Sequence, residues 1–197
     1  MPRPRPGHSL PDVFEVRFHG RGGQGVVTAA ELLSVAAFYD GAYAQAFPSF
    51  GSERTGAPVV SFCRIDERPI RSREPVLTPD AIVIQDATLL HQVDVFGGIK
   101  DGAVALINSR HSIDQLGLGE WAAARSRGHV ATVAASDLAR RYAGSTRANA
   151  ALLGGLAALT GIVSLGSVMR AIDERLPPGN AAAAEACHGE FQEVTVA

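Results

Sequence analysis

Short runs of β-branched and aromatic residues recur along the chain, separated by turn signals or by longer Ala- and Leu-rich stretches. Such short apolar runs predict strands. The predicted strands span residues 14–19, 42–47, 58–65, 81–85, 103–108 and 130–134. The charged segment 66–74 predicts a turn followed by an exposed strand. The run AIVIQ at 81–85 is typical of a buried strand in a parallel sheet.

The longer Ala- and Leu-rich stretches predict helices. The predicted helices span residues 26–39, 88–95, 137–142, 148–159, 165–176 and 181–191. Gly41 follows the first of them and is predicted to cap its C-terminus. Because most of the chain after Ser136 is predicted to be helical, the C-terminal third should pack against the sheet as a group of helices.

Strands that alternate with helices indicate a mostly parallel sheet flanked by helices on both faces. We therefore expect a single α/β domain over residues 14–197, with a Rossmann-like start and a helical C-terminal third. Residues 1–13 are rich in Pro and Arg and lack the hydrophobic core of a signal peptide, so we expect a flexible N-terminal tail.

The turn between the first strand and the first helix has the spacing Gly20-x-Gly22-x-x-Gly25 of a dinucleotide fingerprint, with Gly23 as an additional glycine. Glycines let the backbone approach a diphosphate closely. The start of a helix adds unpaired N–H groups and the positive end of the helix dipole. The loop therefore predicts an anionic ligand without naming it, and a tight turn with no ligand fits the same residues.

Two better-defined nucleotide sites are incomplete in this sequence. An NAD site needs an acidic residue at the end of the second strand, where it binds the ribose hydroxyls. Asp40 lies at about the right sequence distance, but it precedes that strand. A Walker A loop is excluded because no Gly-Lys-Ser/Thr follows the glycines.

Polar side chains in and near the glycine loop are the candidate ligand contacts. Arg21 and Gln24 lie inside it, and a guanidinium beside a phosphate cradle can bind bidentately. The long loop after the second strand should emerge at the same carboxyl edge of the sheet, where open α/β sheets bind ligands. That loop carries Ser49, Glu53 and Arg54. A solvated arginine and a solvated ion pair are the alternative interpretations.

The composition is that of an ordinary globular protein, with 197 residues, 46% of them apolar, and a formal net charge of −2. A sequence-independent nucleic-acid binder would need a basic excess, so we expect no nucleic-acid partner. No apolar run reaches the length of a bilayer span, so we expect no membrane partner either.

Cys63 and Cys187 are the only cysteines of the sequence and lie far apart in it. So few cysteines argue against a disulfide framework and favour a cytoplasmic location. An iron–sulfur cluster needs about four Cys ligands in local spacing. This chain therefore cannot hold such a cluster by itself.

Two long motifs resemble a known family. GRGGQGVVTAAELL at 20–33 is followed by FPSFGSERTGAPVVSFCRIDERPIR at 47–71. Together they resemble the gamma subunit of 2-oxoacid:ferredoxin oxidoreductases, the pyruvate type above all. ANAALLGGLAALTG at 148–161 extends the resemblance to near the C-terminus. Ser52 departs from the family pattern, which commonly has Pro there, and the Pro/Arg-rich N-terminus is extra.

The resemblance implies a subunit of a complex that oxidatively decarboxylates a 2-oxoacid with coenzyme A, giving an acyl-CoA, carbon dioxide and a reduced acceptor. Pyruvate is the leading substrate, with branched-chain acids, aryl-glyoxylates and 2-oxoglutarate as alternatives. Partner subunits of alpha, beta and delta type would carry thiamine diphosphate, magnesium and 4Fe–4S clusters. Ferredoxin or a flavoprotein would accept the electrons.

On this interpretation the chain is structural, has no catalytic residue or metal site, and binds no cofactor alone. It would share in binding coenzyme A. The residues expected to do so are Gly20, Arg21, Gly22, Gly23, Gln24, Gly25, Ser49, Glu53 and Arg54. The competing interpretation is a free-standing NAD- or nucleotide-binding Rossmann-like domain.

Two further polar residues receive structural roles. Asp86 follows the strand at 81–85 and is predicted to cap the next helix at its N-terminus. Asn149 is predicted to be a helix-start or packing residue. The adjacent Gly154 and Gly155 would let another helix approach closely, at some cost in helix propensity.

Overall fold

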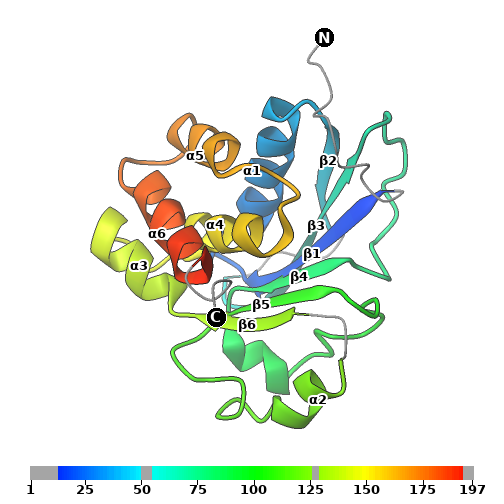
Figure 1. The fold of residues 1–197 in the computed structure, drawn as a ribbon, viewed down its shortest axis with the longest axis vertical. Coiled ribbons are helices and arrows are strands. Elements are labelled where there is room, and N and C mark those ends of the chain that lie inside the picture. Colours follow the sequence, from blue (N-terminus) through cyan, green and yellow to red (C-terminus); the bar gives the residue numbers. More distant parts are fainter. Residues whose placement is uncertain (1–12, 50–54, 126–128, 193–197) are drawn as a thin grey trace.

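Six strands form one sheet in the computed structural model, which describes residues 13–49, 55–125 and 129–192 (Figure 1). The strands are β1 (Phe14–Arg21), β2 (Tyr43–Pro48), β3 (Pro58–Asp66), β4 (Ala81–Ile84), β5 (Val104–Asn108) and β6 (His129–Val133). Residues 1–12 of the predicted tail lie outside the described residues, and so do the candidate site residues Glu53 and Arg54.

The strand order is β2-β3-β1-β4-β5-β6. β1 pairs in parallel with β4, β4 with β5, and β5 with β6, whereas β3 is antiparallel to both of its neighbours. The predicted mostly parallel sheet is therefore confirmed. The carboxyl ends of the parallel strands meet at one edge of the sheet, and the glycine loop follows β1 at this edge.

Helical segments connect and cover the strands. They are α1 (Val26–Tyr39), the 3₁₀ helix η1 (Ala87–His91), α2 (Gly119–Ala123), α3 (Ala135–Ala143), α4 (Asn149–Thr160), α5 (Leu165–Asp173) and α6 (Asn180–Gln192). The single α/β unit with a helical C-terminal third is as the sequence predicts. None of the helices in the described ranges is long and apolar enough to cross a bilayer.

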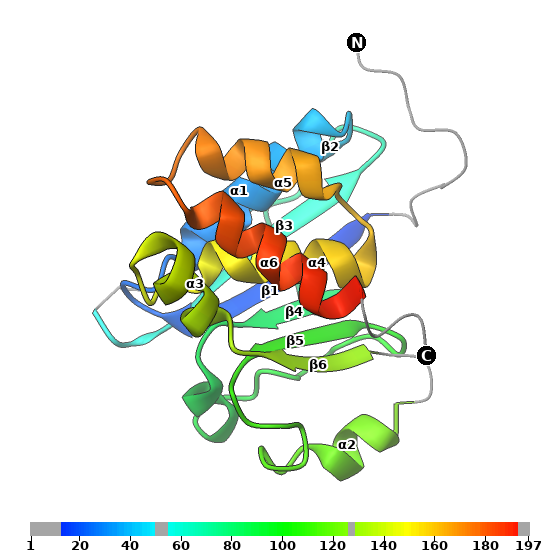
Figure 2. The same cartoon turned by 60° about the vertical axis from the view of Figure 1, so that its left-hand side comes forward.

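The sheet separates two apolar layers of unequal size. Ile82 and Ile84 of β4 pack on one face and Val83 on the other, as expected for alternating side chains. On the Val83 face lies the larger core, with α1, α3, α4, α5 and α6 (Figures 1 and 2). The opposite face carries η1, α2 and their connections. Both faces are thus covered, but all the longer helices share one of them.

The exposed strand predicted within 66–74 is wrong, because β3 ends at Asp66 and no further strand precedes β4. Arginine side chains hold the backbone of this region instead. Arg64 Nη1 donates to the carbonyl of Ser72 at 3.3 Å, and Arg17 Nη1 donates to the carbonyl of Val76 at 3.3 Å. Their guanidinium groups supply hydrogen bonds that a neighbouring strand would otherwise provide.

The close helix approach predicted from Gly154 and Gly155 is confirmed between α4 and α6. A Cβ on Gly154 would overlap the backbone carbonyl of Ala184, and a Cβ on Gly155 would lie 3.0 Å from the Sγ of Cys187. Since α4 is buried along most of its length, this contact fixes α4 firmly. The first turn of α4 is thereby placed beside the glycine loop.

Candidate functional site

The glycine loop makes a sharp turn from β1 into α1. Gly23 and Gly25 have φ values of 92° and 77°, which residues other than glycine rarely adopt. A Cβ on Gly20 would lie 2.6 Å from Val26 Cγ2, and a Cβ on Gly25 would lie 2.6 Å from Asn149 Nδ2. The glycines therefore serve backbone conformation and close packing at this turn.

Asn149 links the loop to the helical layer. It is the first residue of α4, it is buried, and it packs against the backbone of Gly25. The prediction of a helix-start residue is confirmed. Its contact brings the start of α4 next to the start of α1, and neither helix has a side-chain cap.

Arg21 points across the sheet edge and is held by the protein itself. Its Nε donates to Asp86 Oδ2 at 3.1 Å, and its Nη1 donates to the carbonyl of Gly56 at 3.0 Å. Its Nη2 donates to Thr88 Oγ1 at 2.7 Å and to Gln92 Oε1 at 2.8 Å. In this arrangement Arg21 joins three segments, and it would have to break these hydrogen bonds to bind a phosphate with its guanidinium group.

Gln24 completes the same network. Its Oε1 accepts from the backbone N–H of Arg21 at 2.7 Å, and its Nε2 donates to Asp86 Oδ2 at 2.8 Å. Burial raises the pKa of Asp86, but hydrogen bonds from Thr88 and Gln24 and the charge of Arg21 outweigh it, so this pKa lies below its usual value. Asp86 also caps η1 by accepting from the Thr88 N–H, as predicted.

The second loop meets the glycine loop at its far end. Gly22 N–H donates to the carbonyl of Ala57 at 2.9 Å, and Gly56 N–H donates to the carbonyl of Gly22 at 3.1 Å. Ser49 is exposed, and its N–H continues the β2–β3 pairing by donating to Val60 at 2.9 Å. The structure thus brings the two predicted loops together. The ligand roles of Ser49, Glu53 and Arg54 stay predictions.

A cavity of about 200 Å³ opens at the carboxyl edge, next to this network. Its walls come from the glycine loop, the end of β4, the start of α3 and the segment before α4. The lining residues are Gly23, Gln24, Gln85, Ser136, Thr146, Arg147 and Ala148. Of the predicted candidate contacts that lie within the described ranges, Gly23 and Gln24 alone line it.

Behind the loop lies a buried pair of basic side chains. Arg17 Nε donates to His19 Nε2 at 3.0 Å, and the other Arg17 donors bind the carbonyls of Val76, Val95 and Gly97. Burial, and then the charge of Arg17, lowers the pKa of His19 to about 3. His19 is therefore neutral near pH 7 and serves as an acceptor, which makes it a support of the loop.

Asp40 lies away from the glycine loop and has another task. Its carboxylate accepts from the Ser164 hydroxyl at 2.7 Å and from the Ser167 hydroxyl at 2.8 Å, at the start of α5. It precedes β2, at the opposite edge of the sheet from the loop. The acidic residue that an NAD site requires is therefore not supplied by Asp40.

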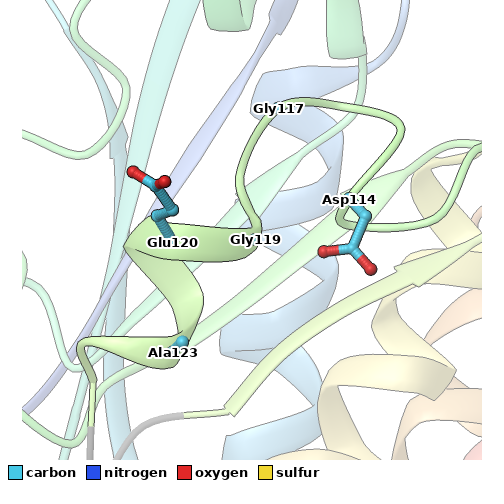
Figure 3. Close-up of a pocket in the computed structure, with 5 residues that line it drawn as sticks. All are labelled: Asp114, Gly117, Gly119, Glu120 and Ala123. Carbon is cyan, nitrogen blue, oxygen red and sulfur yellow. The ribbon is translucent and has the colours of Figure 1, made fainter.

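A larger but open hollow lies elsewhere, around α2 (Figure 3). Asp114, Gly117, Gly119, Glu120 and Ala123 line it, and the two carboxylates point apart in the close-up. No group of His, Cys, Asp and Glu side chains within the described ranges is arranged to hold a metal ion. The chemistry of the candidate site therefore rests on the edge cavity.

Comparison with known proteins decides the family. The family model for pyruvate ferredoxin/flavodoxin oxidoreductase matches residues 15–189. The chain belongs to this family. The resemblance inferred from the two sequence motifs is thus confirmed.

Two curated relatives in the pyruvate ferredoxin/flavodoxin oxidoreductase family match along most of the chain. The pyruvate synthase subunit PorC of Methanosarcina barkeri is 48% identical over 158 residues, covering 80% of this chain and 84% of the relative. The common gamma subunit of the pyruvate/ketoisovalerate oxidoreductases of Thermococcus kodakarensis is 46% identical over 177 residues, covering 88% and 94%.

Solved structures agree with the fold. The PORC subunit of pyruvate oxidoreductase from Thermotoga maritima has 31% identity and a TM-score of 0.76, covering 91% of this chain and 97% of that one. A 2-oxoglutarate:ferredoxin oxidoreductase from Magnetococcus marinus, with 2-oxoglutarate, coenzyme A and succinyl-CoA bound, has a TM-score of 0.69 at 15% identity. It covers 94% of this chain, which matches 31% of that longer one. At this identity the likeness concerns the fold alone.

Sequence reasoning missed five of the residues that line the cavity in this family member, namely Gln85, Ser136, Thr146, Arg147 and Ala148. Gln85 carried a signal that could have been read, because it is the polar end of an otherwise apolar strand at the edge where ligands bind. Ser136 lies at the start of α3 and Arg147 in the segment before α4, and the fold brings both of them to the end of β4.

Proposed function

We propose that the chain is the gamma subunit of a multi-subunit complex that oxidatively decarboxylates a 2-oxoacid with coenzyme A and passes the electrons to ferredoxin or a flavoprotein. Its near full-length match to a pyruvate synthase subunit and to a common gamma subunit supports this assignment. Alpha-, beta- and delta-type subunits would complete the complex. The chain would act in the cytoplasm.

Pyruvate is the substrate we propose first, with branched-chain acids second. One relative is a subunit common to pyruvate and ketoisovalerate oxidoreductases, so in that organism the gamma subunit serves two substrates. A shared subunit is a poor place for substrate selection. In the complex proposed here, we therefore expect the partner subunits to select the substrate.

Thiamine diphosphate, magnesium and 4Fe–4S clusters would belong to those partners. The residues of this chain do not fit an iron–sulfur cluster: Cys63 is on β3, Cys187 is on α6, and both are buried. Burial raises the pKa of both thiols, which disfavours the thiolate form that a metal needs. We therefore assign no redox step to this chain.

We further propose a share in binding coenzyme A, at the carboxyl edge of the sheet. One observation carries this part: the starts of α1 and α4 converge without side-chain caps beside the edge cavity. Such helix starts favour phosphate groups. The oxidoreductase of Magnetococcus marinus that shares the fold has coenzyme A bound.

The function is tested by expressing the chain with its partner subunits and assaying purified complex against a panel of 2-oxoacids, with coenzyme A and a viologen dye. We expect highest turnover with pyruvate or a branched-chain acid, and loss of the assembled complex when the chain is omitted. A complex that forms and turns over fully without the chain would contradict the proposal.

The free-standing nucleotide-binding alternative has an equally direct test. On this alternative the purified chain alone would bind NAD, and the quenching of its protein fluorescence would measure that binding. We expect no binding, because Asp40 is engaged at α5 and does not reach the glycine loop.

A further inference from the structure

The outer edge of β2 is open. In the described part of the chain β2 pairs with β3 on one side and ends the sheet on the other. Residues 43–47 of this strand contain no charged residue and no proline, which are the features that commonly protect an edge strand from a partner. Such an edge can accept a further strand through backbone hydrogen bonds.

The pairing with β3 shows which backbone groups of β2 face outward. Just past the end of β2, the Ser49 N–H donates to the carbonyl of Val60 at 2.9 Å, in the same register as the strands. In an antiparallel pair, residues that exchange hydrogen bonds alternate with residues that do not. Counted back from Ser49, Ala44 and Ala46 are not bonded to β3, so their N–H and C=O groups point out of the sheet.

The sequence of this edge is nearly symmetric about Gln45. It reads Tyr43-Ala44-Gln45-Ala46-Phe47, with an aromatic residue at each end and an alanine on each side of the centre. A twofold contact between two copies needs a self-complementary segment. With antiparallel strands centred on Gln45, Ala44 meets Ala46 of the second copy, and the two residues exchange both N–H···O bonds. Tyr43 then lies opposite Phe47 of the second copy, which is a favourable aromatic pair.

The neighbouring registers fit less well. A shift of the centre by one residue toward the N-terminus would need the N–H of Ala42, which already donates to the carbonyl of Ala37 at 3.0 Å. A shift by one residue the other way would need an N–H from Pro48, and proline has none. The register centred on Gln45 therefore leaves no backbone donor of the new pairs without its acceptor.

Large exposed side chains accompany this edge. Tyr43 at the start of β2 is 51% exposed, and Phe38 in the last turn of α1 is 65% exposed. Exposed apolar side chains gathered in one part of a surface are typical of protein interfaces. Pairing of two β2 strands would cover Tyr43 with an aromatic ring of the second copy.

We propose that β2 pairs with β2 of a second copy of this chain, antiparallel about a twofold axis at Gln45. The two sheets then form one sheet of twelve strands, six from each copy. The proposal goes beyond the function proposed above and does not depend on it, since no step of turnover requires this contact. A strand from another subunit is the competing occupant of the edge.

Disulfide trapping tests the contact and its register. Gln45→Cys places the new thiol of each copy at the axis. Directly opposed residues of this kind have Cα atoms about 4.5 Å apart, within the roughly 4.4–6.8 Å that a disulfide spans. Tyr43→Cys is the matched control on the same strand, because its two copies would lie about 14 Å apart. The native cysteines, Cys63 and Cys187, are both buried and should contribute little background.

Both cysteine variants are oxidised mildly, as the purified full chain and within the assembled complex, and are analysed on non-reducing gels. We expect Gln45→Cys to give a covalent dimer of this chain in both preparations, and Tyr43→Cys to give none. A crosslink from Tyr43→Cys but not from Gln45→Cys would contradict the proposed axis. A crosslink in the free chain that is absent from the complex would show that another subunit covers β2 there, and would overturn the proposal.

Sedimentation equilibrium of the full chain provides a second measurement. We expect a mass near twice the 20.6 kDa of one chain. Gln45→Lys should weaken the dimer by at least about tenfold, because two ammonium groups would face each other at the axis. Gln115→Lys makes the same exchange at an exposed position before α2 and should leave the dimer unchanged. Thermal unfolding verifies that both variants are folded.

A chain that stays monomeric, with no crosslink from Gln45→Cys, would overturn the proposal. So would a dimer whose dissociation constant is unchanged in Gln45→Lys, because it would form at another surface. In either case, turnover of a 2-oxoacid by the complex would leave the function proposed above intact.

Discussion

Two adjacent parts of the sheet edge contain the same residue types in opposite states. In the glycine-loop network, Arg21 and Gln24 each donate a hydrogen bond to Asp86, and Gln24 also accepts one from the backbone of Arg21. In the cavity, Arg147 and Gln85 have no such partners among the described residues. The difference indicates which part builds the site and which part meets a ligand. A side chain whose polar groups are all bonded within the protein supports the fold, and we propose that the ligand meets the unpaired side chains that line the cavity.

Gly25 lies between the two parts, and its replacement should cause the largest loss in the free energy of unfolding. Gly25→Ala would strain a backbone at φ 77° and press a Cβ against Asn149 at 2.6 Å. Strain of this kind costs about 1–3 kcal/mol, and the overlap adds to it. Urea unfolding should show the loss. A full-stability variant would mean that the contact between the loop and α4 does not matter.

Arg21→Ala should rank next, because it frees the carboxylate of Asp86 and the carbonyl of Gly56 at once. We expect a loss of about 1–3 kcal/mol in the free energy of unfolding. Affinity for phosphate should fall less than in Arg147→Gln. If Arg21→Ala weakens phosphate binding more strongly than Arg147→Gln and keeps its stability, the roles assigned to the two arginines are reversed.

His19 makes the supporting network sensitive to acid. Its pKa in the fold is about 3, below the value of 6.5 in the unfolded chain. The unfolded state therefore binds the proton first, so the stabilisation is complete above pH 6.5 and is lost as the pH falls toward 3. The slope attributable to this group is at most about 1.4 kcal/mol per pH unit.

The measurement is urea unfolding between pH 7 and pH 4, with His19→Gln as the comparison. A Gln side chain can still accept from Arg17 but does not titrate, so the variant should show a shallower pH dependence. Identical pH profiles in the two proteins would show that His19 does not carry the effect.

Arg147→Gln should have the smallest effect on stability, within about 0.5 kcal/mol, because its side chain is exposed and unpaired. This expectation separates it from Arg21→Ala, which should reduce stability. Thermal unfolding of the two variants side by side checks the contrast. A large loss in Arg147→Gln would place this residue in the supporting network.

The sequence predicted the fold well where hydrophobic pattern and turn chemistry agree. Helix α1 begins at Val26 and ends at Tyr39 as predicted, because Gly25 and Gly41 bracket an apolar stretch. The strand predicted for the segment after β3 was wrong, because the side chains of Arg64 and Arg17 bind the backbone of this region. No local pattern encodes such contacts.

The candidate site was predicted only in part, for a similar reason. The glycine loop was visible as a motif, and so was the ligand-binding edge of the sheet. Arg21 has hydrogen-bond partners and the Gln85 amide has none because of the side chains that the fold places near each of them. A motif indicates where a site lies, and a survey of hydrogen bonds shows which polar groups have no partner within the described residues.

The most direct test of the account is steady-state kinetics of the assembled complex carrying Arg147→Gln, with Arg141→Gln as control. We expect KM for coenzyme A to rise about tenfold while KM for the 2-oxoacid and kcat stay nearly constant, since Arg147 is proposed to contribute to binding and not to the chemical step. An unchanged KM for coenzyme A, or a loss confined to kcat, would contradict it.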